Sequence, residues 1–251
     1  MLKKTFSILI TLFCLANASA QEKFTPDINL QNVTGVIING ATEVKLEQQL
    51  TPEISIIASP EIKENMTVAV NEQGQLLIDF GSDINKFFKS KKNRPNIYIS
   101  LPKLNYLKIS GVANVLCSGT FKTDEEFVLI TNGKSFVEFL NVKAPKINVS
   151  TLGVSQVSEM KVNTAEMTVE ANNVSSANII GEVSGKMILR TNNTGSINTL
   201  NVKCPDIKAS AFGMSNMKVH VETKAHVEAG GTSSFRYTGT GAVSGDGGKK
   251  L

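Results

Sequence analysis

Residue types that commonly carry metal or redox chemistry are scarce in this chain. Its 251 residues include no Trp, only 3 Cys and only 2 His. The two histidines, His220 and His226, are expected on opposite faces, and neither has a third ligand at a metal-like spacing. No C-x-x-C, G-x-S-x-G, H-E-x-x-H or phosphate-loop motif occurs in the sequence. We therefore expect no metal centre, no redox pair and no bound cofactor.

A membrane-spanning run is also missing. The apolar run from Phe6 to Leu15 is too short to cross a bilayer. It follows a basic start, Lys3 and Lys4, and precedes Ala18-Ser19-Ala20, an A-x-A cleavage pattern. These features together predict that residues 1–20 form a signal peptide.

A strong charge of either sign is absent as well. Without the two lysines of the signal peptide, 24 basic residues stand against 22 acidic ones, a net charge of +2. Such a balance argues against nucleic-acid binding. We expect an exported protein that begins near Gln21, lies in the periplasm or on the outer cell surface, and has no transmembrane segment after signal removal.

The chain is rich in one feature, a repeat of about 20 residues. The stretch LKISGVANV (107–115) returns six times, with a Gly or Asn at its centre and a small residue two positions later. The seven centres are Gly111, Gly133, Gly153, Asn173, Asn193, Gly213 and Gly231. VIINGATEV (36–44) fits the same template around Gly40. A fixed period of this length is typical of a solenoid.

The alternation within each copy predicts the shape of one coil. Positions at even offsets from the centre share one face of a strand, and they are apolar at the ends and small in the middle. A central Gly or Asn suits a bend with positive φ. With neighbouring strands about 4.8 Å apart, the pattern predicts an all-β, single-domain parallel β-helix with coils of about 20 residues.

A column of charges tests this register independently. Seven residues before the centres, the sign alternates without a break: Glu126, Lys146, Glu166, Lys186, Asp206 and Lys224. Stacked coils would place each charge beside an opposite one. The same register puts Cys117 and Cys204 four coils apart, beyond the reach of a disulfide, so both thiols are expected buried and reduced.

The chain divides into four parts on this basis. After the signal peptide, residues 21–103 are expected to form the first coils and an N-terminal cap, residues 104–240 the regular coils, and residues 241–251 a Gly-rich tail that frays. Before Pro95 lies a cluster of basic residues, interpreted as a solvated loop in preference to a site for an anionic polymer: Lys86, Lys89, Lys91, Lys92 and Arg94.

The segments VTGVIINGATEVKLEQ and LPKLNYLKISGVANV, with the repeated Gly/Asn-centred coils, resemble the DUF2807 family. These are auto-transporter adhesin "head GIN domain" proteins common in Bacteroidetes. The resemblance covers about residues 30 to 240. It implies a β-helix similar to pectin lyases but without their catalytic residues, and a role in cell adhesion. Here the centres are often Asn-Asn or Phe-Gly where the family has Ser-Gly.

An enzymatic function is an alternative, because parallel β-helices include polysaccharide lyases and hydrolases. Glycoside hydrolysis needs two carboxylates about 5–10 Å apart, whereas the charge column places Lys186 between Glu166 and Asp206. The run Asp124-Glu125-Glu126 falls in a predicted turn, and the Ser column two residues after the centres points inward without a partnering His. We favour a non-enzymatic adhesion, binding or assembly module, with a carbohydrate-active enzyme as the alternative.

A partner surface is predicted at the bend. Residues on either side of the centres should face outward there, yet several are large and apolar: Leu152, Val154, Val174, Phe212 and Met214. Phe136, three after its centre, adds to them. Soluble monomers seldom expose contiguous apolar patches. The alternatives are that the bend turns these side chains inward, or that they bind a second copy of the chain, an envelope protein or an envelope glycan.

Overall fold

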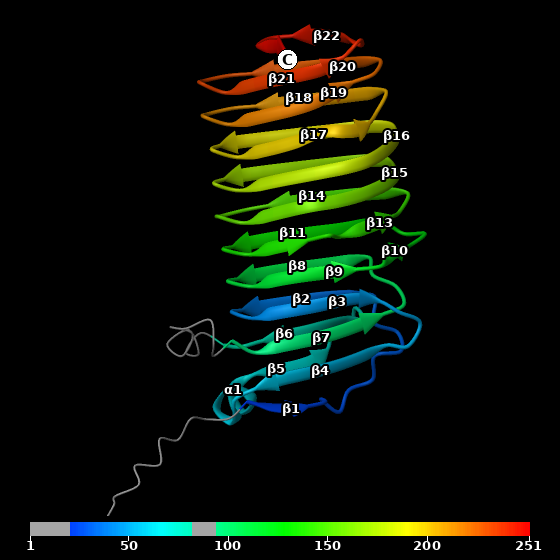
Figure 1. Ribbon diagram of the computed structural model, residues 1–251, viewed down its shortest axis with the longest axis vertical. Coiled ribbons are helices and arrows are strands. Elements are labelled where there is room, and N and C mark those ends of the chain that lie inside the picture. Colours follow the sequence, from blue (N-terminus) through cyan, green and yellow to red (C-terminus); the bar gives the residue numbers. More distant parts are fainter. Residues whose placement is uncertain (1–20, 82–93) are drawn as a thin grey trace, which may run out of the picture.

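The protein is described by a computed structural model that covers residues 21–81 and 94–251. The predicted signal peptide and the four lysines of the predicted loop before Arg94 lie outside these residues. The chain forms a β-solenoid of about 7 turns whose coils stack along one axis (Figure 1). The predicted fold class is confirmed.

The regular coils build three sheets, which we call the first, second and third sheet in chain order, and the last coils have no strand in the third. The first sheet contains β2 (Gly35–Gly40), β6 (Gln75–Asp79), β8 (Tyr106–Gly111), β11 (Phe127–Gly133), β14 (Lys146–Thr151), β18 (Asp206–Ala211), β20 (Lys224–Ala229) and β22 (Ala242–Gly245). The long strands β15 (Gln156–Asn173) and β16 (Ser176–Asn193) run through all three sheets.

The second sheet follows the bend. It contains β3 (Glu43–Gln48), β7 (Asn96–Leu101), β9 (Asn114–Ser118), β12 (Phe136–Glu138), β17 (Ser196–Lys203), β19 (Asn216–Val221), β21 (Ser234–Gly239) and β23 (Gly248–Lys250). The short third sheet contains β10 (Thr120–Lys122) and β13 (Asn141–Lys143) beside the middle parts of β15 and β16.

The predicted centres form one column at the bend between the first and second sheets. All eight have positive φ, from 60° at Asn193 to 124° at Gly40. The residue after each centre donates its backbone N–H to the preceding centre's carbonyl, as in Val154 to Gly133 at 2.7 Å and Met214 to Asn193 at 2.7 Å. The bend is therefore hydrogen-bonded from coil to coil, and its backbone is tolerated best by Gly and Asn.

Inside the bend, the small residues form a polar ladder within an otherwise apolar core. Hydroxyl pairs link neighbouring coils, with Oγ–Oγ distances of 2.9 Å for Thr131–Ser155 and 2.9 Å for Thr151–Ser175. These side chains are buried. The Ser column is thus satisfied by Thr and by backbone carbonyls, as buried hydroxyls require, and it fills the core as predicted.

The charge column stacks in the predicted order. Lys146 pairs with Glu166, Glu166 with Lys186, and Lys186 with Asp206 in the strand register. At the two ends of the column the side chains form ion pairs, Lys146–Glu126 at 3.1 Å and Lys224–Asp206 at 3.2 Å. The column is solvent-exposed, so each pair contributes little.

Replacing Glu166 by Lys would place three lysines in a row. We expect a loss of about 0–1 kcal/mol in the free energy of unfolding, which added salt would reduce because the column is exposed. Urea unfolding at low and high salt measures both quantities. A loss of several kcal/mol that salt does not change would contradict an exposed column.

The N-terminal coils do not follow the order of the chain. Strand β2 lies between β6 and β8, and β3 lies between β7 and β9. Beyond them, antiparallel strands close the end of the solenoid: β1 (Glu22–Phe24), β4 (Glu53–Ala58) and β5 (Thr67–Val70). Strands β4 and β5 cover the edge of the coil formed by β6 and β7, which would otherwise present unpaired backbone groups to another chain.

Two local features differ from the sequence-based expectations. A short helix, α1 (Pro60–Asn65), joins β4 to β5 and begins with Ser59, whose hydroxyl accepts a hydrogen bond from the N–H of Ile62. The tail, expected to fray, forms β22 and β23, which pair in parallel with β20 and β21. Backbone ladder bonds hold this last coil although its side chains are largely exposed.

Cys117 and Cys204, the two cysteines of the described residues, are free and buried, as predicted. Burial raises the pKa of the Cys117 thiol to about 12 and that of Cys204 to about 11.

Because the thiolate is the reactive form, neither thiol should react with iodoacetamide at pH 8 in the folded protein, and both should react in urea. Mass spectrometry reads the labelling; a Cys117–Cys204 disulfide would refute the register.

Candidate functional site

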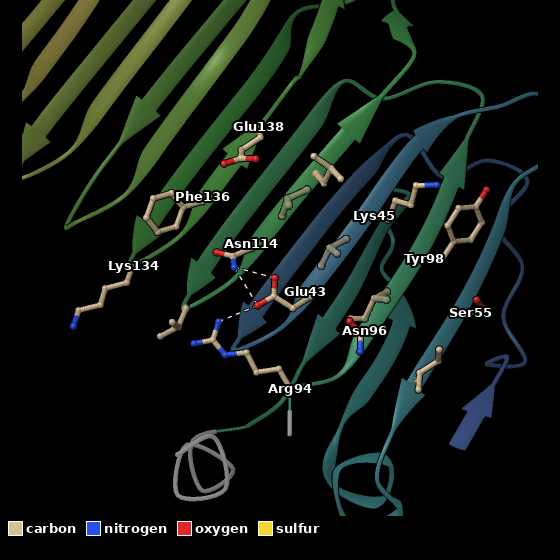
Figure 2. A pocket seen from close by; sticks show the side chains of 16 residues that line it. Glu43, Lys45, Ser55, Arg94, Asn96, Tyr98, Asn114, Lys134, Phe136 and Glu138 are labelled. Carbon is tan, nitrogen blue, oxygen red and sulfur yellow. Dashed lines mark hydrogen bonds and ion pairs between the residues drawn. The ribbon is translucent and has the colours of Figure 1, made fainter. Parts of the chain in front are cut away.

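An open groove of about 780 Å³ lies on the outer face of the second sheet (Figure 2). Its floor is built from β3, β7, β9 and β12, with β4 along one side. These strands come from segments far apart in the sequence, and the insertion of β3 between β7 and β9 brings them together. The volume falls within the range of small-molecule sites.

Apolar side chains line the groove although they face solvent. Ile57, Leu116 and Phe136 are 37%, 44% and 38% exposed, and the ring of Tyr98 lines the groove beside Lys45. Alternation along each strand forces this direction, because Ile97, Val115 and Val137 point into the core.

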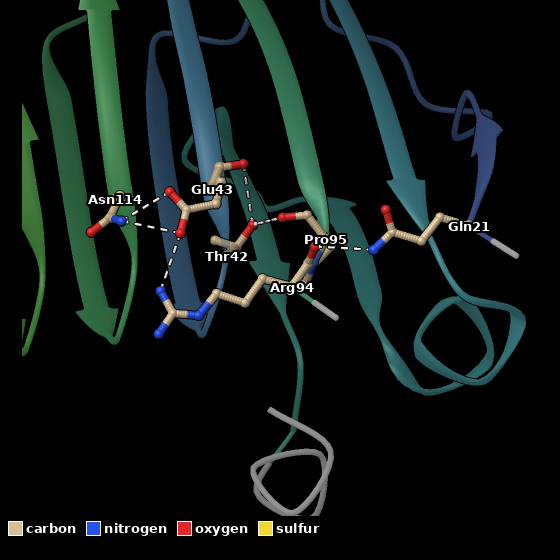
Figure 3. Close-up of polar contacts among 6 residues, drawn as sticks. All are labelled: Gln21, Thr42, Glu43, Arg94, Pro95 and Asn114. Atoms are coloured by element: carbon tan, nitrogen blue, oxygen red, sulfur yellow. Dashed lines mark hydrogen bonds and ion pairs between the residues drawn. The ribbon is translucent and has the colours of Figure 1, made fainter. Parts of the chain in front are cut away.

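Polar side chains are fixed at the end of the groove where the strands begin (Figure 3). Asn114 Nδ2 donates to both carboxylate oxygens of Glu43, at 2.9 and 3.0 Å. Arg94 Nη1 reaches Glu43 Oε1 at 3.1 Å, and the Arg94 side chain is only 12% exposed. Thr42 Oγ1 donates to the Pro95 carbonyl at 2.9 Å and holds the start of β7 against β3.

A second polar group lies further along the same strands, around Glu47 of β3. Glu47 accepts from Lys45 Nζ at 2.5 Å and from the Tyr98 hydroxyl at 2.9 Å. The hydrogen bond from Lys45, followed by that from Tyr98, lowers the pKa of Glu47 to about 2. Glu47 therefore stays charged at neutral pH and holds the Tyr98 ring in place.

The groove contains fixed binding groups and no constellation typical of catalysis. Of the two carboxylates among the described residues that line it, Glu43 is engaged by Arg94 and Asn114, which leaves Glu138 without a second free carboxylate to work with. Within residues 21–81 and 94–251, no group of three or more His, Cys, Asp or Glu could hold a metal ion. The arrangement suits recognition of a ligand with both polar and apolar parts.

The residues of the predicted partner surface lie elsewhere, at the bend. Val154, Val174, Phe212 and Met214 are 49%, 61%, 46% and 70% exposed, whereas Leu152 is half-buried. The coil between Val174 and Phe212 carries Asn192, Asn193 and Thr194 at the same positions, so the stripe consists of two parts. Asn193 Nδ2 donates to Asn173 Oδ1 at 2.9 Å, so the two Asn centres are linked from coil to coil.

The carboxylate run 124–126 lies on an exposed turn, as predicted. Lys146 pairs with Glu126, and Asn105 Nδ2 donates to Glu125 Oε2 at 2.5 Å. The two histidines stand apart: His220 Nδ1 is 3.0 Å from Thr238 Oγ1, and His226 Nδ1 is 3.1 Å from Ser244 Oγ. Neither group forms part of the groove.

Fold and groove together describe a β-solenoid with an open groove on the outer face of one sheet. The family model "DUF2807: Putative auto-transporter adhesin, head GIN domain" matches residues 32–241. The chain therefore belongs to the DUF2807 family, as its sequence predicted. No match is found among curated proteins.

Several solved structures share the fold. A "putative lipid binding protein" from Parabacteroides distasonis is 16% identical, with a TM-score of 0.78 and coverage of 93% of this chain and 98% of its own. A "putative adhesin" from Parabacteroides merdae is 19% identical, with a TM-score of 0.76 and coverage of 94% and 95%. At this identity the likeness shows the fold alone. No helix in the described part of the chain is long and apolar enough to cross a membrane.

Proposed function

We propose that this chain is an exported, non-enzymatic binding protein of the cell envelope, in the periplasm or on the outer surface, which holds its ligand in the groove of the second sheet. The groove carries this proposal, because it exposes apolar side chains beside a fixed polar network. Membership of an adhesin family and neighbours titled as adhesins support a role in attachment. The predicted signal peptide supports export.

The alternative, a carbohydrate-active β-solenoid enzyme, has weaker support. In the groove Glu43 is already engaged by Arg94 and Asn114, and the hydroxyl column inside the bend is buried against Thr side chains. A hydrolase of this kind needs a pair of carboxylates, and with Glu43 engaged only Glu138 remains free among the described residues that line the groove. We expect no turnover of any polysaccharide by the purified protein.

One experiment tests both statements. The protein beginning at Gln21 is incubated with envelope fractions, and bound and cleaved material are measured together. We expect saturable binding that Leu116→Ser combined with Phe136→Ser weakens at least several-fold, because both side chains face the groove. Leu50→Ser is the matched control, since Leu50 is 89% exposed outside the groove. Sustained cleavage that depends on groove residues would favour the enzyme instead.

The two-part stripe at the bend is proposed as a second contact, for a further copy of the chain or an envelope protein. Burying a large apolar side chain fully contributes about 1.5–3 kcal/mol, and four of the stripe residues are exposed. Phe212→Ser with Leu152→Ser should reduce self-association or surface binding, as read by sedimentation beside the wild type. If the variant and the wild type were the same folded monomer and bound the surface equally, the stripe would not be a contact surface.

A further inference from the structure

We infer that the groove of the second sheet binds an acidic saccharide, with its carboxylate near Arg94 and Lys134 and its sugar rings against Leu116, Phe136 and Tyr98. This inference rests on the proposed function and names the chemistry of its ligand.

The end of the groove where β3, β9 and β12 begin is rich in hydrogen-bond donors. Arg94 donates from Nη1 to Glu43, and no other side chain in the described residues accepts from its guanidinium. Lys134 is exposed at the same end and makes no ion pair with another described residue (Figure 2). Because Arg94 neutralises Glu43, Lys134 leaves a positive charge at this end. The other carboxylate of the groove, Glu138, lies four residues further along the chain. A carboxylate of the ligand would therefore complement this end of the groove.

The floor of the groove is mixed in a way that suits sugars. In the strand register Asn114 lies opposite Phe136, and Leu116 lies opposite both Lys45 and Glu138. Apolar and polar groups therefore alternate across strands about 4.8 Å apart. A sugar ring has C–H groups on its faces and hydroxyl groups at its edge, so it can use both kinds of contact.

An acyl chain fits this floor less well. It would cross the charged groups of Glu43 and Lys45 between the apolar pairs Ile57–Tyr98 and Leu116–Phe136, and it would stay partly in water because the groove is open. Hydrocarbon would remove water from these two charged groups, which is unfavourable even though each has an ion-pair partner. The mixed lining favours the saccharide.

The polar groups are held before any ligand arrives. Glu43 is fixed by three hydrogen bonds, and Tyr98 by its bond to Glu47 and by Lys45 Nζ at 5.8 Å from its ring centre. Fixed side chains lose little conformational freedom on binding. Asn96 is exposed between Ile57 and Glu43, and its side-chain amide makes no hydrogen bond to another described residue, which leaves this amide for the ligand.

The test is calorimetric titration of the protein beginning at Gln21 with a galacturonic acid trisaccharide and with the neutral galactose trisaccharide of the same linkage. We expect the acidic sugar to bind more tightly, and added salt to weaken it. Phe136→Ala should lower the affinity about two- to tenfold through the lost ring contact. Lys134→Gln should lower it and reduce its salt dependence.

Matched controls come from the opposite part of the molecule. Phe212→Ala removes a ring of similar exposure at the bend, and Lys208→Gln removes an exposed lysine on β18. Neither should change the affinity. The inference would be overturned if the neutral sugar bound equally well, or if no saccharide bound. It would also be overturned if the control variants had equal effects, or if laurate or an acidic peptide displaced the sugar.

The two proposals fail in distinguishable ways. Envelope binding that the groove variants weaken but the acidic trisaccharide does not displace would refute the saccharide and keep the binding role. Saccharide binding without any envelope binding would uphold the site and refute the role. Displacement of bound envelope material by the acidic trisaccharide alone supports both.

Discussion

Replacing Phe127 by Ala is expected to lower the free energy of unfolding by about 3–5 kcal/mol. Phe127 begins β11, and its ring is fully buried inside the solenoid, in register with Ile147 of the next coil. The cavity left by the ring cannot close easily, because ladder hydrogen bonds hold each coil at a fixed distance from its neighbours. This loss is a large part of the stability of an ordinary domain.

Phe136→Ala is the matched control, on the next strand of the same coil. Its ring is 38% exposed in the groove, so we expect a loss below about 1 kcal/mol. Urea unfolding followed by two spectroscopic probes measures both variants and shows whether the solenoid unfolds in one step. Equal losses for the two phenylalanines would contradict the placement of either ring.

Replacing Gly133 by Ala is expected to cost about 3 kcal/mol or more, of which the left-handed backbone accounts for about 1–2 kcal/mol. A Cβ at this position would lie 2.4 Å from the carbonyl oxygen of Gly111, and the φ of Gly133 is 82°. The same oxygen accepts the N–H of Lys134 at 2.7 Å, so the methyl group would disturb the bond that joins the two coils. The melting temperature should fall by about 6–12 °C.

Gly81→Ala separates backbone strain from collision. Gly81 has a φ of 62°, and a Cβ there would meet nothing within 4 Å, so only the strain remains, about 1–2 kcal/mol. Thermal unfolding of the two variants side by side gives the comparison. If both lost the same stability, close stacking at the bend would not be what excludes a side chain at Gly133.

The regular coils could be predicted from the sequence because the bend makes a demand that few residues meet. Positive φ at every centre restricts the column to Gly and Asn, as at Gly153 and Asn173. The alternating charges then fixed the same register independently, from Glu126 to Lys224. Local chemistry determines the fold in this part of the chain.

The order of the N-terminal coils could not be predicted in this way. Strands β2 and β6 have similar alternation, and nothing local tells which of them lies beside β8. The helix α1 did leave a signal, Ser59 before Pro60 and Glu61, which is typical of a helix start. It was missed because the flanking segments have the alternation of strands.

The groove depends on that unpredictable order. Glu43, Arg94 and Asn114 meet only because β3 lies between β7 and β9. The exposure of Phe136 was predicted from its position three residues after the centre Gly133. Its place in a groove was not predicted. The one local signal for this surface is a large apolar residue, such as Leu116, at a strand position whose side chain should face outward.

The interleaving of β2 and β3 also has a consequence for how such a chain can change in length. From β8 onward each coil packs on the one before it in the chain, so duplication or loss of a 20-residue unit leaves every remaining neighbour in place. In the N-terminal part the same event would separate β2 from β6 or β8, two partners distant in sequence. Gene duplication can therefore lengthen the solenoid at the far end, while the coils that form the groove must be inherited as one block.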